Sequence, residues 1–287
     1  MIAMDGGVAR ACRWIVAAAS AIAIGGGGVA LGATSNQATT TVPTSSLGSA
    51  TAQCKNGEVA LAGGFAAPGW DPTTANGGPA ARLDSVPAAN QRGIITTGFN
   101  FNDNQPEKLR SFAYCGKRAR PPKVRSMSVQ VQPNSFNSAT ATCPERSRAI
   151  GGGFGTDQAV LTLTSKRSGG RGWKVLGVNV PQLGGSSGPA SLTAYAYCKT
   201  PGPVLKTASK DTTLSTGFLT TTVRCPNGGR ALSGGFDGHL AVVSNELRAA
   251  GALDSKRADH GHAWATKALS TSPPSEATLT TYAYCHR

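Results

Sequence analysis

Short stretches in which polar and apolar residues alternate run through most of the chain. Ser126–Val131 and Val160–Thr164 alternate in this way, and Trp173–Val178 and Leu192–Tyr197 are rich in β-branched and aromatic residues. A period of two with this composition predicts β-strands. Thr-rich Thr220–Val223 fits a half-exposed sheet. We therefore predict an all-β protein, with one exception: Ala-rich Asn245–Leu253 is a possible helix.

A series of short motifs recurs three times in the same order, which indicates internal repeats. In each copy a Gly-Gly-Phe triplet places its Phe 11 positions after an opening cysteine, and the copy closes with Leu-x-x-aromatic-Ala-Tyr-Cys. Between these motifs come Arg92-Gly93-Ile94, Arg171-Gly172-Trp173 and His262-Ala263-Trp264. We predict three repeats of about 80 residues with about six strands each, at 34–118, 119–202 and 203–287.

Each repeat holds one opening and one closing cysteine, which indicates how the cysteines pair. Six cysteines alone allow about fifteen connectivities. The repeat predicts Cys54–Cys115, Cys143–Cys198 and Cys225–Cys285. The alternative of metal ligation is disfavoured because no C-x-x-C pair is present and the partners lie 55 to 61 residues apart. Each bridge should contribute about 4 kcal/mol in the chain-entropy account.

The segments between the repeats contain prolines. Gly116–Arg125 holds Pro121-Pro122, and Lys199–Lys206 holds Pro201-Gly202-Pro203. Such connectors favour extended, semi-rigid spacing. Two arrangements remain open: three tandem small β-sandwiches, or a β-prism of three sheets closed around a pseudo-threefold axis.

Residues 1–33 have the pattern of a secretory signal peptide. Arg10 and Arg13 precede the apolar stretch Ile15–Leu31, and small residues follow. The alternative is a retained transmembrane anchor, which Gly25–Gly28 and the Ala-rich composition make a weak one. We expect cleavage after Gly32 or Ala33, and a secreted monomer with no membrane anchor.

The mature chain would keep six cysteines, an even number that suits three disulfides in an exported protein. Only 39% of the 287 residues are hydrophobic and 6% are aromatic, so each core must be thin and built from small side chains. Small modules of this kind need covalent support.

The combination of Cys143-Pro144, Cys225-Pro226-Asn227-Gly228, Gly-Gly-Phe and Tyr-Ala-Tyr-Cys resembles a repeat module of exported proteins from high-GC Gram-positive bacteria. That module has no assigned activity, so the resemblance implies export, β structure and a disulfide. Repeat 1 departs from it, with Lys55 in place of Pro and Ile94 in place of Trp. The threefold repetition is also similar to the β-prisms of vitelline outer-layer proteins and certain lectins.

The Gly-Gly-Phe triplet has a structural and a functional interpretation. It is either a strand bulge, where Gly allows close backbone approach and Phe fills the core, or a glycine-rich ligand loop. Its constant spacing favours the bulge. Trp173 and Trp264 are likewise expected in the core, because Ile94 at the equivalent position has no π-face for a sugar.

Catalytic motifs give little support for an enzyme, and no cofactor is predicted. Gly184, Ser186 and Gly188 match G-x-S-x-G, but the match lies in a Gly/Ser-rich loop without the strand and helix that a nucleophile elbow needs. The four histidines all lie in repeat 3: His239, His260, His262 and His286. Asp259–His262 is either a polar surface loop or, with alternate residues on one strand face, a set of metal ligands. The alternative of a secreted hydrolase would place its site in repeat 3.

Charge is the remaining indication of function. Without residues 1–33 the chain has 26 basic and 13 acidic residues, a net charge of +13. No basic run is interleaved with aromatic residues, and an exported protein does not meet nucleic acid. Outside the cell the available anions are wall polymers, phosphate-bearing glycans and lipid head groups, although the charge could also serve solubility alone.

The first linker is the most basic segment, and Pro121-Pro122 should keep it extended. Its basic residues are Lys117, Arg118, Arg120, Lys123 and Arg125. We predict a secreted, non-enzymatic surface or binding protein that contacts anionic cell-wall glycans electrostatically, most strongly near this linker.

Overall fold

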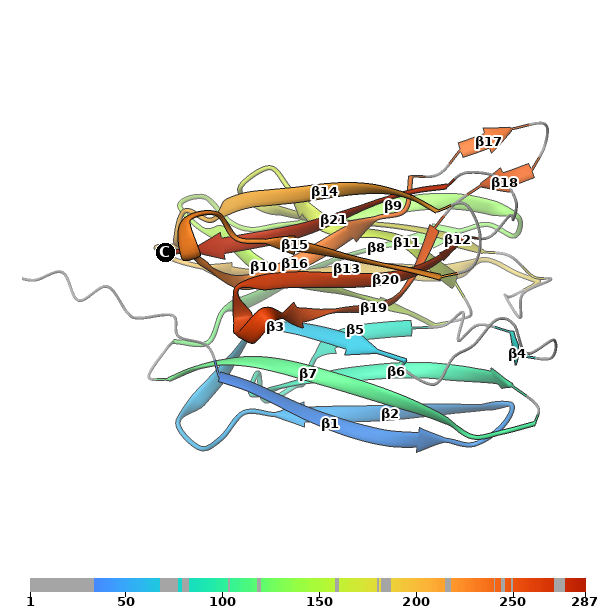
Figure 1. Ribbon diagram of the computed structural model, residues 1–287, viewed down its shortest axis with the longest axis horizontal. Helices are drawn as coiled ribbons and strands as arrows, with labels where there is room; N and C mark the ends of the chain where they lie inside the picture. The colour runs from blue at the N-terminus through green and yellow to red at the C-terminus, as the bar shows by residue number, and fades with distance from the viewer. Residues whose placement is uncertain are drawn as a thin grey trace, which may run out of the picture. The chain divides into compact units, whose positions relative to one another are not determined.

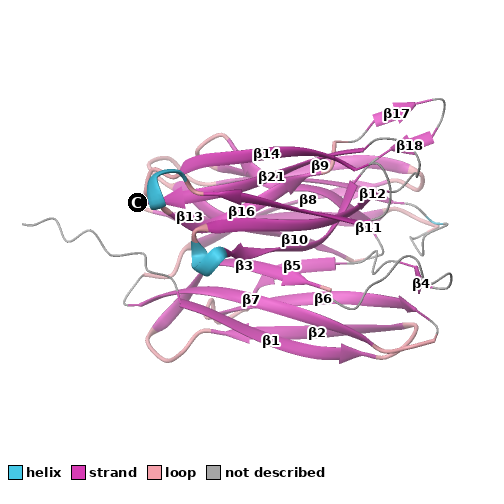
Figure 2. Cartoon of the chain, in the orientation of Figure 1, coloured by secondary structure: helices cyan, strands magenta, loops and turns pink. Residues whose placement is uncertain are grey.

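The computed structural model describes most of the chain after residue 33. The described ranges are 34–67, 77–78, 83–102, 104–117, 120–157, 160–179, 181, 187–214, 218–239, 241–243, 246–248, 250–270 and 277–287. The predicted signal segment 1–33 lies outside them. The described residues belong to one compact unit, and the chain is all-β as predicted (Figure 2).

Each repeat contributes six principal strands, and Figure 1 shows them running side by side. Repeat 1 has β1 (Thr34–Val42), β2 (Ser46–Gln53), β3 (Glu58–Ala66), β5 (Leu83–Pro87), β6 (Gly93–Asn102) and β7 (Glu107–Lys117). Repeat 2 has β8 (Lys123–Val131), β9 (Ser135–Thr142), β10 (Arg148–Thr156), β11 (Val160–Ser168), β12 (Gly172–Asn179) and β13 (Ala190–Lys199). Repeat 3 has β14 (Lys206–Leu214), β15 (Phe218–Arg224), β16 (Arg230–Asp237), β19 (Ala250–Ala258), β20 (Ala263–Ser270) and β21 (Ala277–His286). Short strands β4 (Gly77–Gly78), β17 (Ala241–Val243) and β18 (Glu246–Arg248) lie in loops after the third strand of repeats 1 and 3.

The six strands of a repeat form two three-stranded layers. The first, sixth and third strands pair in one layer, and the second, fifth and fourth strands pair in the other. Alternation along a strand turns every second side chain inward. In β13, for example, Leu192, Ala194 and Ala196 are buried while the residues between them are half-buried. Each repeat is thus a small sandwich whose core is built largely from Ala, Leu and Val, with a few large aromatic side chains.

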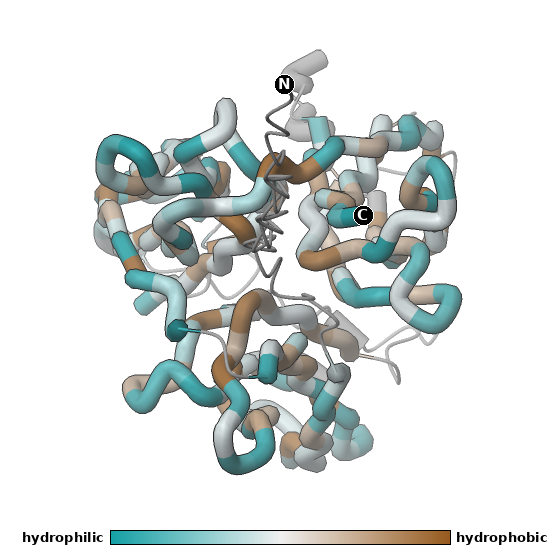
Figure 3. Tube along the Cα trace, turned by 90° about the vertical axis from the view of Figure 1, so that its left-hand side faces the viewer, coloured by the Kyte–Doolittle hydropathy of each residue, from teal (hydrophilic) through white to brown (hydrophobic). Residues whose placement is uncertain are grey.

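The layers continue across the repeat boundaries, so the three sandwiches share their sheets. The third strand of each repeat pairs with the fourth strand of a neighbour: β10 with β5, β16 with β11, and β3 with β19. We call these contacts joint 1/2, joint 2/3 and joint 3/1. They close a ring, and three lobes surround a common centre in Figure 3. The structure therefore combines the two predicted arrangements, with sandwich modules fused around a pseudo-threefold axis.

The Gly-Gly-Phe triplets lie at the joints, and each residue of the triplet has its own steric role. A Cβ atom on the first glycine would collide with the core residue of the same repeat, Ile94, Trp173 or Trp264. A Cβ atom on the second glycine would lie too close to the carbonyl oxygen of a serine in the neighbouring repeat. At Gly64, for example, the Cβ would be 2.7 Å from the Ser255 oxygen. The strand register shifts just before each triplet, so the predicted bulge is confirmed.

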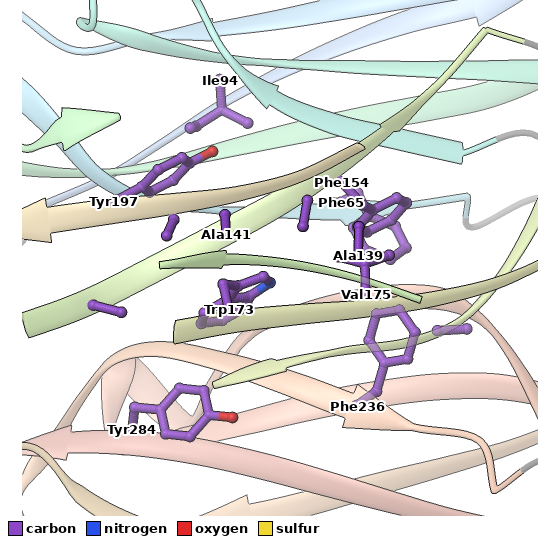
Figure 4. Packing of buried hydrophobic residues seen from close by; sticks show 14 of the residues in the cluster. Phe65, Ile94, Ala139, Ala141, Phe154, Trp173, Val175, Tyr197, Phe236 and Tyr284 are labelled. Carbon is purple, nitrogen blue, oxygen red and sulfur yellow. The ribbon is translucent and has the colours of Figure 1, made fainter. Parts of the chain in front are cut away.

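The three phenylalanines of the triplets meet one another in the interior (Figure 4). Phe65 and Phe154 have ring centroids 5.5 Å apart, and Phe236 lies 6.2 Å from both. All three pairs are edge-to-face, the arrangement favoured by the aromatic quadrupole. Each ring is at most 3% exposed, so one aromatic cluster joins the three cores.

The tyrosine directly before the closing cysteine of each repeat packs across a joint. It contacts the buried Trp or Ile of the neighbouring repeat that lies against the first glycine of that repeat's Gly-Gly-Phe triplet. Tyr114 contacts Trp264 edge-to-face, Tyr284 contacts Trp173 in the same way, and Tyr197 lies beside Ile94. The expectation that the tryptophans belong to the core is confirmed, since Trp173 and Trp264 are 2% and 1% exposed.

The hydroxyl groups of these tyrosines differ between joints. Tyr114 accepts a 2.7 Å hydrogen bond from the backbone N–H of Arg257, and Tyr284 accepts one of the same length from Arg167. Joint 1/2 has Pro87 at the equivalent position, and proline has no N–H. The buried hydroxyl of Tyr197 has no hydrogen-bond partner among the described residues. The pseudo-symmetry is therefore broken at one joint by a single residue.

Three disulfides connect the layers, in the predicted pairing Cys54–Cys115, Cys143–Cys198 and Cys225–Cys285. Each opening cysteine follows the second strand of its repeat and each closing cysteine lies in the sixth. Because these two strands belong to different sheets, every disulfide ties two of the three large sheets together.

One predicted element is wrong. The possible helix at Asn245–Leu253 is replaced, within the described residues, by β18 and the start of β19. Ala250, Ala252 and Leu253 are buried in the ring beside joint 3/1. Their small side chains suit a packed strand there, so tertiary contacts override the helix propensity of alanine.

Replacing the tyrosine before each closing cysteine by Phe should affect the stability of the three joints differently. Tyr114→Phe and Tyr284→Phe should each lower the free energy of unfolding by about 1 kcal/mol, because each leaves a buried N–H without its acceptor. Tyr197→Phe removes a hydroxyl that forms no bond and should be neutral or stabilising. Denaturant unfolding of the three variants checks this, and an equal loss in all three would contradict it.

Removing one disulfide should weaken the entire ring. The Cys143→Ser/Cys198→Ser variant should lose about 4 kcal/mol of stability and still unfold in one transition, because its sheets continue into repeats 1 and 3. Calorimetry and hydrogen exchange of the flanking repeats measure this. Two separate transitions, with repeats 1 and 3 unchanged, would show that the repeats are independent.

Candidate functional site

Exposed basic side chains gather at the end of the ring that carries the disulfides. We call this surface the basic end. Its exposed basic residues are Lys55, Lys117, Arg120, Lys123, Arg125, Arg146, Arg148, Arg171, Lys206, Arg224, Arg230 and Arg287. Among the described residues, the exposed carboxylates there are Glu145 and Asp259, and Asp259 pairs with Arg224 at 3.2 Å. The surface therefore carries a large excess of positive charge.

Strand register explains why these residues share one end. Lys123 pairs with Cys198, Lys206 pairs with Cys285 at the equivalent place, and Arg148 pairs with Lys199. The turns between the fourth and fifth strands return to the same end, since the N–H of Cys143 donates to the carbonyl of Arg171. Threefold repetition thus places basic residues from three distant segments on one surface.

The predicted linker residues belong to the basic end, apart from one that cannot be placed. Lys117, Arg120, Lys123 and Arg125 are exposed there, whereas Arg118 lies outside the described residues. Pro122 between them is buried. The linker is held on the ring, and its charged side chains face solvent.

The carboxylates lie mostly toward the other end. Glu107 begins β7, whose last residues include Cys115, and Asp157 follows β10, which begins at the basic end. The β17–β18 hairpin also marks that end and lies opposite the C-terminus in Figure 1. The described part of the chain is thus electrostatically polarised along its strands.

Several basic residues of this surface lie outside the linker that the sequence predicted. Arg148, Arg171, Lys206 and Arg230 are scattered along the sequence as single charges. Their position is the signal that could have indicated this surface. Each lies in a strand end next to a disulfide or in a turn that is hydrogen-bonded near a cysteine.

The histidines of repeat 3 do not share a strand face. Asp259–Gly261 forms a 3₁₀ turn, not a strand, so the premise of that metal hypothesis is wrong. His262 Nδ1 faces the carbonyl oxygens of Gly228 and Gly229, at 3.1 Å from each. No group of three metal-ligating side chains is found in the described part of the chain. Gly184 and Ser186 of the G-x-S-x-G match lie outside that part.

A second polar cluster occupies joint 2/3. Lys166 in β11 donates to Asp237 at the end of β16, and Thr164 Oγ1 donates to the same carboxylate at 2.9 Å. Burial alone would raise the pKa of Asp237, but the bonds from Lys166 and Thr164 outweigh it and hold the pKa below its ordinary value. This cluster ties repeat 3 to repeat 2.

Nearby, His239 and Asp211 flank one hydroxyl group. Thr280 Oγ1 lies 2.7 Å from Asp211 Oδ1 and 2.7 Å from His239 Nε2. The single hydroxyl proton goes to the carboxylate, so His239 must donate to Thr280. A histidine that activates a hydroxyl has to accept its proton, so His239 does not act as the general base for Thr280 in this geometry.

No protein-family model and no curated protein sequence matches the chain. In the described residues no helix has the length and apolar character needed to cross a membrane.

Asp237→Asn should weaken joint 2/3 in a pH-dependent way. A carboxyl whose pKa is lowered on folding stabilises the fold above its unfolded pKa, and this stability is lost as pH falls through the folded value. At pH 7 the free energy of unfolding of the variant should therefore be about 1–3 kcal/mol lower than that of the wild type. This difference should shrink below about pH 4.

Urea unfolding at pH 7 and at pH 3 measures both values. Asp259→Asn, which removes the exposed ion pair with Arg224, is the control and should cost less than about 1 kcal/mol. A cost for Asp237→Asn that is the same at both pH values would contradict the assignment.

Proposed function

We propose that this chain is a secreted, non-enzymatic surface or binding protein whose basic end contacts anionic polymers of the cell wall. The observation that carries the proposal is the concentration of positive side chains from all three repeats on one end of a rigid ring. The three disulfides support an extracellular location, because disulfides persist in oxidising environments outside the cell. Residues 1–33 would then be the cleaved signal peptide.

The arrangement of charge suits a long polymer better than a small molecule. The side chains of Lys117, Lys123 and Arg146 are exposed and spread over separate segments. Exposed charges act through water and are screened within about 8 Å at physiological salt. Binding by many such contacts would be strong at low salt and weakly selective among polyanions.

The ring also suits a passive role. Framework residues such as Gly-Gly-Phe recur in all repeats, whereas the ionisable residues differ from one repeat to the next. Catalysis needs several groups positioned at one place, and His239 does not accept the proton of the Thr280 hydroxyl. A monomer is sufficient, because the ring closes within one chain.

Neutralising the linker side of the basic end should reduce wall binding. The quadruple variant Lys117→Gln, Arg120→Gln, Lys123→Gln and Arg125→Gln should retain at most about one tenth of the wild-type affinity for purified cell walls at 50 mM salt. Wild-type binding should itself fall steeply as salt rises. Co-sedimentation across a salt series measures both effects.

A matched control removes the same number of charges elsewhere. Lys108, Lys174, Lys210 and Lys267 lie within strands and do not belong to the basic end, and changing them to Gln should have less than about a threefold effect. Equal losses in both quadruple variants would show that net charge alone matters. Salt-insensitive binding to one defined sugar would refute the electrostatic proposal.

A further inference from the structure

Two arginines of repeat 2 converge on one glycine at the basic end. Arg148 is the first residue of β10, and Arg167 lies near the end of β11. Arg167 Nη2 donates to the carbonyl of Gly170 at 3.3 Å. Arg148 Nη1 lies 3.4 Å from the position that a Cβ atom on Gly170 would occupy. The turn between β11 and β12 therefore brings both guanidinium groups to the same residue.

Packing at joint 2/3 fixes the position of Arg167. Its guanidinium lies 5.2 Å from the ring centroid of Tyr284 in repeat 3. The backbone N–H of Arg167 donates to the hydroxyl of the same tyrosine at 2.7 Å. Its Nε is buried and has no hydrogen-bond partner among the described residues. Stacking on an aromatic ring restricts a guanidinium without using its N–H groups, so the outer N–H groups of Arg167 remain for a ligand.

The backbone at Arg148 is also fixed, while its side chain is exposed. The N–H of Ala149, the next residue, donates to the Gly170 carbonyl at 3.2 Å. In the strand register Arg148 pairs with Lys199 of β13. Within the described ranges the Arg148 side chain forms no ion pair and no hydrogen bond. It therefore presents its fork of N–H donors to solvent beside Arg167.

Further positive charge surrounds this pair, without a carboxylate that neutralises it. Lys199 Nζ donates to the carbonyl of Arg120 at 2.8 Å, which brings a lysine of β13 and the first linker together. None of Arg148, Arg167 and Lys199 forms an ion pair with a carboxylate that the structure describes. Like charges at short range disfavour one another, so this group of cations is suited to an anion.

The pKa values of two of these cations reflect the same crowding. Burial lowers the pKa of Arg167 below its ordinary value, the Tyr284 hydroxyl acts against this, and the charge of Arg148 lowers it again. Burial, and then the charge of Arg120, lower the pKa of Lys199. A bound anion would offset both the desolvation and the repulsion.

The arrangement around Gly170 differs from the equivalent places in the other repeats. In repeat 1 the strand positions of the two arginines are taken by Val59 and Pro87, which carry no charge. In repeat 3, Arg257 Nη2 instead donates to the carbonyl of Leu232 within β16. Repeat 2 is therefore where both arginines meet at the turn.

We infer that Arg148 and Arg167 bind one phosphate group, assisted by the charge of Lys199. This inference rests on the proposed function, of which it names the ligand chemistry: a phosphodiester or phosphomonoester carried by a polymer or by a lipid head group. A guanidinium binds two oxygens through parallel hydrogen bonds, and a tetrahedral phosphate can offer oxygens to two such groups. The exposed basic end attracts the polyanion, and this pair of arginines holds one phosphate of it.

Inorganic phosphate tests the site without a polymer. Titration of the protein, followed by calorimetry and by NMR of the arginine Nε–H groups, should show saturable binding that shifts the signals of Arg148 and Arg167. Arg148→Gln should weaken phosphate binding about tenfold, and Arg148→Lys should recover only part of the loss because lysine cannot bind bidentately. Arg148 is the residue to change, because it is exposed and its replacement leaves the stacking of Arg167 on Tyr284 in place.

Arg146→Gln is the matched control. Arg146 is exposed two positions before Arg148 and carries the same charge. Its replacement should change the phosphate affinity less than about twofold, since Arg148 is the side chain that lies against Gly170. Equal losses in the two variants, or phosphate binding that is unchanged in Arg148→Gln, would overturn the inference.

Two further measurements separate this site from the proposed function. The linker quadruple variant should lose wall binding but keep its phosphate affinity within about threefold, because the carbonyl of Arg120 that Lys199 bonds is retained. Wall binding by a wild-type protein that binds no phosphate would overturn this site and leave the proposed function standing.

The source of the phosphate is identified by displacement. Soluble poly(glycerol phosphate) and phosphatidylglycerol vesicles are each added to the protein in the presence of inorganic phosphate, and the Nε–H signals of Arg148 and Arg167 are followed. Displacement by the polymer assigns the site to the wall, and displacement by the vesicles assigns it to a lipid surface. Displacement by neither would overturn the inference.

Discussion

The close backbone approach at the Gly-Gly-Phe triplets is the constraint on which the rest of the structure depends. The second glycine of each triplet admits the carbonyl group of a neighbouring serine, as Gly64 does for Ser255. Any side chain there would separate the third strand of one repeat from the fourth strand of the next. Without that pairing the sheets would end within each repeat, and small modules poor in large apolar side chains would have to stand alone. With it, the three phenylalanines meet and three thin cores become one.

Fusion of the repeats also explains where the pseudo-symmetry can fail. The joints share the same strand pairing, yet Pro87 removes a hydrogen bond from joint 1/2, and a Lys166–Asp237 pair is added to joint 2/3. Repetition supplies a stable frame, and the departures from repetition supply the places where specific chemistry can arise.

Charge is arranged by the same geometry. Antiparallel strands bring cysteines, linkers and the turns before the fifth strands to one end, so a modest excess of basic residues becomes a concentrated surface. The linker part of that surface is visible in the sequence as a local run of basic residues. Arg148, Arg171 and Arg230 leave no such run, because each is a single charge whose basic neighbours come from distant segments of the chain.

The local pattern of residues determined the all-β class, the three repeats, the six principal strands of each and the disulfide pairing, because each of these depends on motifs within about 80 residues. Tertiary structure alone decided how the repeats join. The pairing of β3 with β19 links segments almost 200 positions apart, and it involves only a few backbone contacts that leave no periodic signal. The same long-range packing turned the alanine-rich segment before Leu253 into strand and buried the Tyr197 hydroxyl opposite a proline.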